Sequence, residues 1–485
     1  MDYEAVIGLE VHCQLLTESK IFCGCSTRFG SPPNRNVCPV CLGMPGVLPV
    51  LNRRAVDLAL RAALALHCSI RRRSVFSRKN YFYPDLPKGY QISMYDRPLA
   101  EGGHLEIRSD GSVRRIGITR VHMEEDAGKL SHEGFADSDR RSYVDFNRAG
   151  VPLIEIVSEP DIRSPEEAHA YYSTLRDLLV EIGVTDGNME EGSLRCDANV
   201  SLRPRGEEPL GTKTELKNLN SFRFVQQALE YEIRRQTEVL ASEGRLTQET
   251  RLFDPKSGRT FPMRSKEEAH DYRYFPEPDL PPLEIDPAWI ERVRAELPPK
   301  LLAQRRREYR RAYGLPEQLA STVTMSHAHA DYFAAAARAA GGDGKAAANW
   351  FSTEVLRRLN ERKIELSGPQ DVPLDPARLG RLILLVSGGT ISGKAAKEVL
   401  EEIFDSGRDP EDVVRERGLV QISDEAPIRE AIEKVIAASP DQLAKYRAGK
   451  SALLGYFVGQ VMKATGGRAN PGLVNRLLKD RLGRP

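Results

Sequence analysis

Hydrophobic and polar residues alternate in short runs along roughly the first 285 residues, and Gly, Pro and Asn interrupt these runs. In RCDANVSLR (195–203) every second residue is apolar, which is the period of two expected of a half-buried strand. SPEEAHAYYSTLRDLLVEIG (164–183) instead has a Ser-Pro-Glu-Glu helix start and ends at a glycine. This mixture of periods predicts an α+β domain.

After Pro287 the pattern becomes helical almost throughout. HADYFAAAARAAGG (329–342) is Ala-rich and ends at two glycines, as helices commonly do. A proline cluster, FPEPDLPPLEI (275–285), marks a first boundary, and a second lies near or after VSGGTISGK (386–394). We expect three domains, which are a strand-rich domain of residues 1–290, an all-α helical domain of residues 291–405, and an all-α tail domain of residues 406–485.

The stretch LILLVSGGTISGKAAKEVL nearly matches the phosphate-binding loop pattern G-x4-G-K-[ST]. Ala395 occupies the last position, where a hydroxyl would hold Mg²⁺, and the neighbouring sequence lacks the alternating strands of a parallel sheet. A helix end, a Gly-Gly turn and a new helix capped by Thr390 or Ser392 explain the same residues. We favour the turn.

Composition narrows the class of protein. The 485 residues and the 40% hydrophobic content fit about three globular domains, and the net charge of +1 means that any nucleic-acid contact must come from a local basic patch. The longest apolar runs, such as LILLV (382–386), are far shorter than the ~18 residues that span a bilayer. MDYEAVIGLE (1–10) lacks the basic start and apolar run of a signal peptide. We expect a soluble, cytoplasmic protein with no membrane contact.

Four of the seven cysteines, Cys23, Cys25, Cys38 and Cys41, have the spacing C-x-C-x12-C-x2-C. Four thiolates bind Zn²⁺ tetrahedrally, and two close pairs joined by a loop reach that geometry without a large core. The alternative is four unrelated buried thiols. We expect a structural Zn²⁺ site and no role for these cysteines as nucleophiles.

Acidic residues gather around histidines in the strand-rich half. Glu10 and His12 are two residues apart in IGLEVHCQL, so on a strand both side chains point to one face. Carboxylates and imidazoles that converge on a concave sheet would form a site suited to Mg²⁺. The alternatives are a solvated acidic face and a buried histidine bonded to a backbone carbonyl. Further members of this group are His122, Glu124, Glu125, Asp126, Glu190, Glu191, Asp197 and Glu215.

The end of the sequence is basic. Residues 441–485 hold nine Lys or Arg and two Asp, a net charge of +7 in an otherwise near-neutral chain. Such a patch is typical of surfaces that bind phosphate backbones. A merely solubilising surface is the alternative.

Long irregular motifs follow one another in a fixed order along the chain. They are YEAVIGLEVHCQL (3–15), the Cys23-x-Cys25 pair, CPVCLGMPG (38–46), KNYFYPDLPKGYQIS (79–93), VDFNRAGVPLIEIVSEPD (144–161), GSLRCDANVSLR (192–203), KTELKNLNSF (213–222) and GQVMKATGGRANP (459–471). On these motifs the sequence resembles the B-subunit family of the aspartyl/glutamyl-tRNA(Asn/Gln) amidotransferases over essentially its whole length.

The resemblance implies an N-terminal cradle domain, built on an antiparallel sheet with glutamine-synthetase-like architecture, followed by a helical domain and a tail domain that contacts tRNA. It implies a heterotrimer with an amidase A subunit and a small C subunit. The B subunit would use ATP and Mg²⁺ to phosphorylate the side-chain carboxylate of mischarged Glu-tRNA(Gln) or Asp-tRNA(Asn). Ammonia channelled from the A subunit would then give Gln-tRNA(Gln) or Asn-tRNA(Asn).

The resemblance also assigns roles to individual residues. The expected catalytic residues are Glu10, His12 and Glu125. The expected Mg²⁺ ligands, direct or through water, are Glu10, His12, Glu124, Glu125, Glu191 and Glu215. The expected nucleotide or substrate contacts are Lys79, Tyr81, Lys88, Asn147 and Arg148. The expected tRNA contacts are Lys450, Lys463, Arg468, Arg476 and Lys479.

Release of ammonia from glutamine requires an activated nucleophile, and the sequence contains no Ser/Gly-rich amidase segment. The three remaining cysteines, Cys13, Cys68 and Cys196, lie in apolar alternation and are expected in the core. A partner must therefore supply ammonia. The alternative function is a non-catalytic, zinc-containing subunit that binds tRNA and supports assembly.

Overall fold

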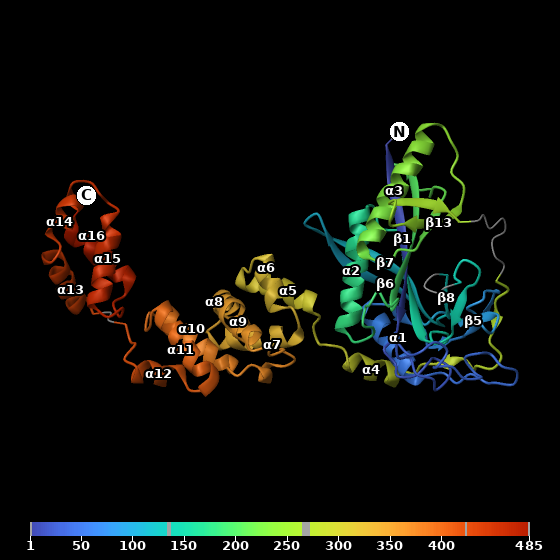
Figure 1. Ribbon diagram of the computed structural model, residues 1–485, viewed down its shortest axis with the longest axis horizontal. Helices are drawn as coiled ribbons and strands as arrows, with labels where there is room; N and C mark the ends of the chain where they lie inside the picture. Colours follow the sequence, from blue (N-terminus) through green and yellow to red (C-terminus); the bar gives the residue numbers. More distant parts are fainter. Residues whose placement is uncertain (1, 133–136, 264–271, 422–423, 484–485) are drawn as a thin grey trace. The chain divides into compact units, whose positions relative to one another are not determined.

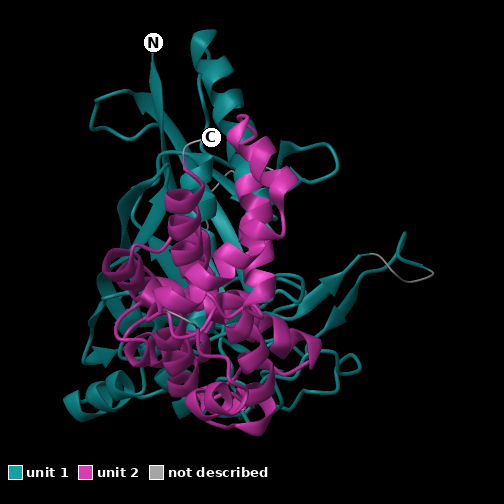
Figure 2. Cartoon of the chain, turned by 90° about the vertical axis from the view of Figure 1, so that its left-hand side faces the viewer, with its two compact units in different colours: residues 1–299 teal, residues 300–485 magenta. Residues whose placement is uncertain are grey.

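The structure is a computed structural model that describes residues 2–132, 137–263, 272–421 and 424–483. Residue contacts divide the chain into two compact units, unit 1 (Met1–Pro299) and unit 2 (Lys300–Pro485), which Figure 2 colours separately. Unit 1 combines a large sheet with a few helices, whereas unit 2 is helical in its described part (Figure 1). The expected α+β class is confirmed.

The large sheet of unit 1 contains strands from almost every part of that unit. Within the described part, twelve strands join it. Their order is β14 (Arg259–Pro262), β13 (Glu249–Asp254), β12 (Thr214–Lys217), β11 (Leu194–Pro204), β1 (Tyr3–Gln14), β10 (Pro152–Ser158), β7 (Ser112–Glu125), β5 (Tyr90–Ser93), β4 (Ser77–Asn80) and β15 (Phe275–Pro276), with β6 (Ala100–Ser109) pairing β7 and β2 (Ser69–Ile70) pairing β6.

The sheet differs in one respect from the expected antiparallel one. Strands β12 and β13 pair in parallel, because the long helix that connects them returns the chain to the same end of the sheet, whereas the other pairs are antiparallel. The sheet is therefore mixed. Two small two-stranded sheets lie beside it, formed by β3 (Arg73–Ser74) with β16 (Leu283–Glu284) and by β8 (Lys129–Ser131) with β9 (Tyr143–Asp145).

The side chains of strand β1 show that the two faces of the large sheet differ. Leu9, Val11 and Cys13 are fully buried, whereas Glu10 and His12 between them are only half-buried. Because side chains alternate along a strand, the apolar face belongs to the core and the opposite face carries polar groups. Three helices pack on the sheet: α1 (Arg53–Ala65) against β7 and β10, α2 (Pro165–Glu181) against β1 and β6, and α3 (Phe222–Ala241) against β11. A fourth helix, α4 (Pro287–Ala295), packs on α1.

The described part of unit 2 has two hydrophobic cores. One is formed by buried residues between Leu315 and Val414, and the other by buried residues between Ile428 and Leu482. The domain boundaries after residues 290 and 405 stay predictions. The helices are α5 (Leu302–Tyr313), α6 (Glu317–Val323), α7 (His327–Ala339), α8 (Gly344–Trp350), the π-helical η1 (Phe351–Val355), α9 (Leu356–Glu361), the 3₁₀ turn η2 (Pro369–Asp371), α10 (Pro376–Ser387), α11 (Gly393–Ser406), α12 (Pro410–Glu416), α13 (Glu425–Ala437), α14 (Pro440–Arg447), α15 (Leu453–Ala464) and α16 (Pro471–Leu482).

The glycine-rich loop of unit 2 connects two helices. Helix α10 ends at Ser387, and α11 begins after Ser392, whose hydroxyl accepts a hydrogen bond from the Ala395 N–H at 3.2 Å. The predicted turn between two helices is confirmed, because helix α10, and not a strand, leads directly into this loop. No helix among the described residues is both long and apolar enough to cross a bilayer.

Candidate functional site

Three strands bring histidines and glutamates together on the polar face of the sheet. In the strand register, His12 of β1 lies opposite Glu155 of β10, and Glu155 lies opposite His122 of β7. His12 Nε2 is 3.3 Å from Glu155 Oε2 and 3.9 Å from Glu124 Oε1, and each of the three residues offers one ligand atom within 4.8 Å of the others. We call His12, Glu124 and Glu155 the histidine–glutamate cluster.

His122 contacts the same two carboxylates. Its Nε2 is 3.8 Å from Glu124 Oε2 and 3.6 Å from Glu155 Oε2. Burial raises the pKa of both carboxyls, but His122 and His12 outweigh burial and lower the pKa of each. Burial lowers the pKa of His12, but Glu155 and Glu124 outweigh it and raise that pKa. The two largely buried carboxylates are thus held ionised, as ligands of a cation must be, whereas a cation that binds His12 has to displace the proton of its imidazole.

Glu10 and Glu215 lie farther along the polar face. Glu10 accepts a hydrogen bond from Asn199 Nδ2 at 2.9 Å, and burial, together with nearby carboxylates, raises the pKa of Glu10. Glu215 is bound by Lys217, whose Nζ is 2.9 Å from Glu215 Oε1 and 2.7 Å from Asp197 Oδ2. Lys217 therefore already supplies a positive charge to Glu215 and Asp197.

Asp126 is a buried carboxylate at the end of β7. It accepts hydrogen bonds from Gln14 Nε2 at 2.7 Å and from both terminal nitrogens of Arg195, at 2.8 and 3.0 Å. Arg148 Nε lies 3.7 Å away. Burial raises the pKa of Asp126, but the two guanidinium groups outweigh it and hold the pKa below its usual range. This network holds Arg148 close to the polar face.

Glu125 is not brought together with Glu124. Consecutive residues of a strand point to opposite faces, and the Glu125 carboxylate is bonded to Lys88 and to the Ile92 N–H at 2.9 Å. It lines a small cavity with Lys20, Cys23, Cys41, Lys88 and Tyr90, among other residues. Glu125 and Lys88 therefore form a pair beside the cysteines, apart from the histidine–glutamate cluster.

Lys79 and Tyr81 lie close to the histidine–glutamate cluster. Lys79 contributes to lowering the pKa of Glu155, and burial, together with Glu124, raises the pKa of Tyr81. Lys79 Nζ is 4.9 Å from the ring centre of Tyr272 and 6.0 Å from that of Tyr81. A cation and aromatic rings thus border the carboxylates.

The remaining two site candidates lie in loops. Asn147 precedes Arg148, and its side chain is hydrogen-bonded to Asn36 and Pro32 in the loop between Cys25 and Cys38. Glu191 is half-buried in the turn before β11, where its N–H donates to Asn188 Oδ1 at 3.3 Å. Among the described residues the Glu191 side chain makes no hydrogen bond or ion pair with the histidine–glutamate cluster, so its role stays a prediction.

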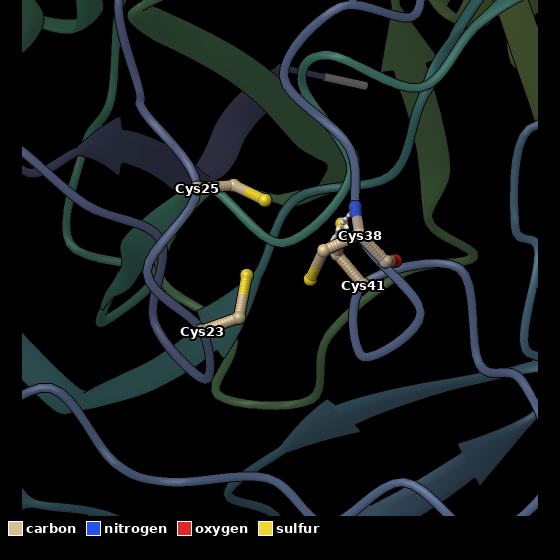
Figure 3. A group of neighbouring side chains, drawn as sticks. All are labelled: Cys23, Cys25, Cys38 and Cys41. Atoms are coloured by element: carbon tan, nitrogen blue, oxygen red, sulfur yellow. Dashed lines mark hydrogen bonds between the residues drawn. The ribbon is translucent and has the colours of Figure 1, made fainter.

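The four spaced cysteines converge. Their sulfur atoms lie within 4.8 Å of one another, and Figure 3 shows the side chains of two chain segments pointing toward a common space. The Sγ atoms of Cys38 and Cys41 are 3.9 Å apart, close to the roughly 3.8 Å edge of a tetrahedron with 2.3 Å zinc–sulfur bonds. We call Cys23, Cys25, Cys38 and Cys41 the cysteine cluster. Its donor set and spacing fit a zinc ion.

Cys41 differs electrostatically from the other thiols whose pKa is shifted. The hydrogen bond from Cys23 and the nearby Lys20 lower the pKa of Cys41 to about 4, whereas burial raises the pKa of Cys25 to about 11. Burial raises the pKa of Cys13 and of Cys68 to about 12. Cys13, Cys68 and Cys196 are buried, as expected of core residues.

Glu155 is the member of the histidine–glutamate cluster that the sequence motifs did not single out. It is one acidic residue in the otherwise apolar strand sequence PLIEIVS, and it is 8% exposed. A charge in a buried strand is costly unless it is paired, and this was the available signal. The sequence groups Asp126 and Asp197 with the other acidic residues, but it gives no sign of their partners Arg195 and Lys217.

The predicted tRNA contacts are surface residues. Lys450, Lys463, Arg468, Arg476 and Lys479 are all exposed on α14–α16 or the loops between them. Arg476 pairs with Glu425 at 2.7 Å, whereas the other four enter no ion pair with a described residue. Their role in binding tRNA stays a prediction.

The chain thus combines an α+β domain, which carries two clusters that could hold metal ions, with a helical unit. Residues 5–291 match the family model described as the GatB/GatE catalytic domain, and residues 331–482 match the one described as the GatB domain. The chain therefore belongs to the family of aspartyl/glutamyl-tRNA(Asn/Gln) amidotransferase B subunits.

Similarity to individual relatives extends over the whole chain. The sequence is 56% identical over 481 residues to the B subunit of the aspartyl/glutamyl-tRNA(Asn/Gln) amidotransferase from Carboxydothermus hydrogenoformans, covering 99% of each chain. It is 58% identical over 482 residues to the protein of the same name from Moorella thermoacetica, covering 99% of this chain and 100% of that one. The family resemblance deduced from the motifs is confirmed.

Proposed function

We propose that this chain is the subunit of a cytoplasmic tRNA-dependent amidotransferase that activates the mischarged amino acid. It would transfer the γ-phosphoryl group of ATP to the side-chain carboxylate of Glu-tRNA(Gln) or Asp-tRNA(Asn). An amidase A subunit and a small C subunit would complete the heterotrimer and deliver ammonia. The names of its relatives, which include both tRNA types, support this proposal.

The observation that carries the proposal is the histidine–glutamate cluster. Two largely buried carboxylates and an imidazole converge on one polar face, and the opposite face of the same strands is core. Apolar residues at these positions would stabilise the fold at least as well, because burying charged groups costs free energy of folding. His12, Glu124 and Glu155 would hold Mg²⁺, which neutralises phosphate charge when bound.

The chemistry requires two displacements. An oxygen of the substrate carboxylate attacks the γ-phosphorus and ADP leaves, which gives a mixed anhydride. Ammonia then attacks the carbonyl carbon and inorganic phosphate leaves. Phosphorylation is needed because an unactivated carboxylate has no adequate leaving group at neutral pH.

The surrounding cations of the chain would position the substrates. Lys79 lies near Glu155, and Arg148 is anchored to Asp126, so both can contact phosphate or carboxylate oxygens at this face. Lys217 pairs with both Asp197 and Glu215, so Glu215 would take part in this arrangement through water or indirectly. Glu10 lies opposite Asp197 in the strand register, two residues from His12 on the same strand.

The second ligand cluster has a structural role in this proposal. The cysteine cluster would hold Zn²⁺ through four thiolates, which leaves no position open for a substrate. The cluster therefore stabilises a loop rather than performing chemistry.

The test uses the complete complex with mischarged tRNA, Mg²⁺ and labelled ATP. His12→Ala and Glu124→Gln are expected to abolish both ADP release and amide formation, and Glu230→Gln, on the exposed surface of α3, is the matched control. ADP release that survives both variants would refute the assignment of the cluster. It would leave the non-catalytic tRNA-binding role as the better function.

A further inference from the structure

Lys20 is a fully buried lysine, with 0% of its surface exposed. Its ammonium donates to the carbonyl oxygen of Asn36 at 2.7 Å, to that of Phe146 at 3.3 Å and to Cys41 Sγ at 3.6 Å. An ammonium has three N–H bonds, so these acceptors use all of them. No ion pair among the described residues includes Lys20, and of its three hydrogen-bond acceptors only the Cys41 sulfur can carry a negative charge.

The contacts of Lys20 join two chain segments that are far apart in sequence. Asn36 and Cys41 belong to the loop of the cysteine cluster, and Phe146 belongs to residues 144–148. A fully buried lysine without a carboxylate is costly. That cost is offset when the cysteine cluster is metal-bound, because four thiolates and one Zn²⁺ leave the cluster, of which Cys41 is a member, with a net negative charge.

Asparagine side chains connect the same two segments. Asn34 accepts from the Phe146 N–H at 2.8 Å and donates through Nδ2 to the Val144 carbonyl at 3.1 Å. Asn147 accepts from the Asn36 N–H at 2.7 Å and donates to the Pro32 carbonyl at 2.8 Å. The loop between Cys25 and Cys38 thus contacts Val144, Phe146 and Asn147 directly.

Residues 144–148 lead directly into the polar face of the sheet. Arg148 donates to the carbonyl oxygens of Ala127 and Gly128, at 3.0 and 2.6 Å, and lies beside Asp126. Asp126 is in turn bonded to Arg195 of β11. A displacement of Phe146 would therefore be transmitted to Asn147 and Arg148, two residues expected to contact substrate.

We infer that Lys20 is a positioning residue that couples metal binding at the cysteine cluster to the placement of residues 144–148. With a metal bound, the ammonium is fixed between the Cys41 thiolate and the Phe146 carbonyl. Without the metal, or without the lysine, this support is lost and Asn147 and Arg148 are less well ordered. The inference rests on the proposed zinc site, and it gives that site a role in substrate binding.

The experiment compares the complete complex carrying wild-type chain, Lys20→Met and Lys213→Met, the last being an exposed lysine as control. Zinc content is measured first, and the zinc is then exchanged for Co²⁺, whose thiolate absorption bands report on Cys41. We expect Lys20→Met to shift these bands and to release metal to a chelator about 10-fold faster, and Lys213→Met to do neither. The inference would be overturned if Lys20→Met had the same bands and the same release rate as Lys213→Met and the wild type.

Hydrogen exchange of the Phe146 and Asn147 amides provides the second measurement. Their exchange is expected to rise about 10-fold in wild type after chelation, and in Lys20→Met while metal is still bound. Unchanged exchange in both cases would show that the segments are not coupled. Absence of zinc from the wild-type complex would instead refute the metal site itself, and the inference with it, while ATP-dependent activity would still report separately on the histidine–glutamate cluster.

A variant that does not depend on the buried position guards against misfolding of Lys20→Met. Asn34 is exposed, and Asn34→Ala removes its bonds to Phe146 and Val144 without touching sulfur. We expect faster exchange at Phe146 with unchanged cobalt bands. Unchanged exchange in this variant would contradict the support that the cysteine loop gives to residues 144–148.

Discussion

Glu124 and Glu125 show how strand geometry separates two neighbouring carboxylates. Glu124 joins His12 and Glu155 on the polar face, whereas Glu125 is bonded to Lys88 on the other side of β7. Because they are adjacent in the sequence, both glutamates were expected to be ligands of the same Mg²⁺. Alternation along the strand instead predicts different effects of substitution at each position.

Glu155 is the sharpest test at the scale of single residues. Glu155→Gln keeps the shape of the side chain but removes one charged ligand and the partner of both His12 and His122. We expect Mn²⁺, used as a probe for Mg²⁺, to bind about 10- to 100-fold more weakly in calorimetric titration. The exposed Glu230→Gln should bind as wild type does, and equal binding by both variants would exclude Glu155 as a ligand.

Individual residues were predictable where spacing alone defines geometry. The period of β1 placed Glu10 and His12 on one face, and the cysteine spacing predicted a cluster, as the structure shows. Glu155 was not predicted, because its proximity to His12 depends on the pairing of β1 with β10, which are about 140 residues apart in sequence. The same holds for the pairing of Asp126 with Arg195. Long-range register is not encoded in a local pattern.

Elements were easier to predict than their pairing. The alternation of residues 195–203 corresponds to β11, and the capped segment after Ser164 corresponds to α2. The parallel pairing of β12 with β13 was not expected, because it depends on how α3 returns the chain. The π-helical turn at Phe351–Val355 also has no simple signature in sequence.

That π-helical turn carries a buried, strongly paired carboxylate. Glu354 is 2.9 Å from Arg358 and 2.9 Å from Lys397. Burial raises its pKa, but Lys397, Arg358 and Arg357 outweigh burial and lower the pKa to about 2. Since the pKa falls on folding, the stabilisation is present above the unfolded value of about 4.3 and is lost as the pH falls toward 2.

We therefore expect Glu354→Gln to destabilise the first core of unit 2 by about 2 kcal/mol at pH 7. The difference from wild type should shrink below about pH 4.3, as measured by hydrogen exchange of the α9 amides across pH 3–7. Glu361→Gln removes an exposed partner of Arg357 and is expected to cost less than about 0.5 kcal/mol. A pH-independent difference for Glu354→Gln would show that its charge contributes nothing.

At the scale of the whole molecule, the chain consists of parts with their own cores. The core between Ile428 and Leu482 contains no residue of the core between Leu315 and Val414. The part between Ile428 and Leu482 carries four exposed cations that enter no ion pair with a described residue, which are Lys450, Lys463, Arg468 and Lys479. A part that folds around its own core and carries unpaired positive charge is suited to bind a phosphate backbone.

Ending the chain after residue 421 tests this role. We expect tRNA binding by the complete complex to weaken, with the slope of log affinity against log salt reduced by roughly three, because about four phosphate contacts are lost. Unit 1 should stay folded, since its sheet and helices lie before residue 300. A full-length variant with Gln at Lys450, Lys463, Arg468 and Lys479 should reproduce the reduced slope, because it removes charge and keeps the core. An unchanged slope in both proteins would mean that these cations only increase solubility. A reduced slope in the truncated chain alone would mean that other residues after position 421 contact tRNA.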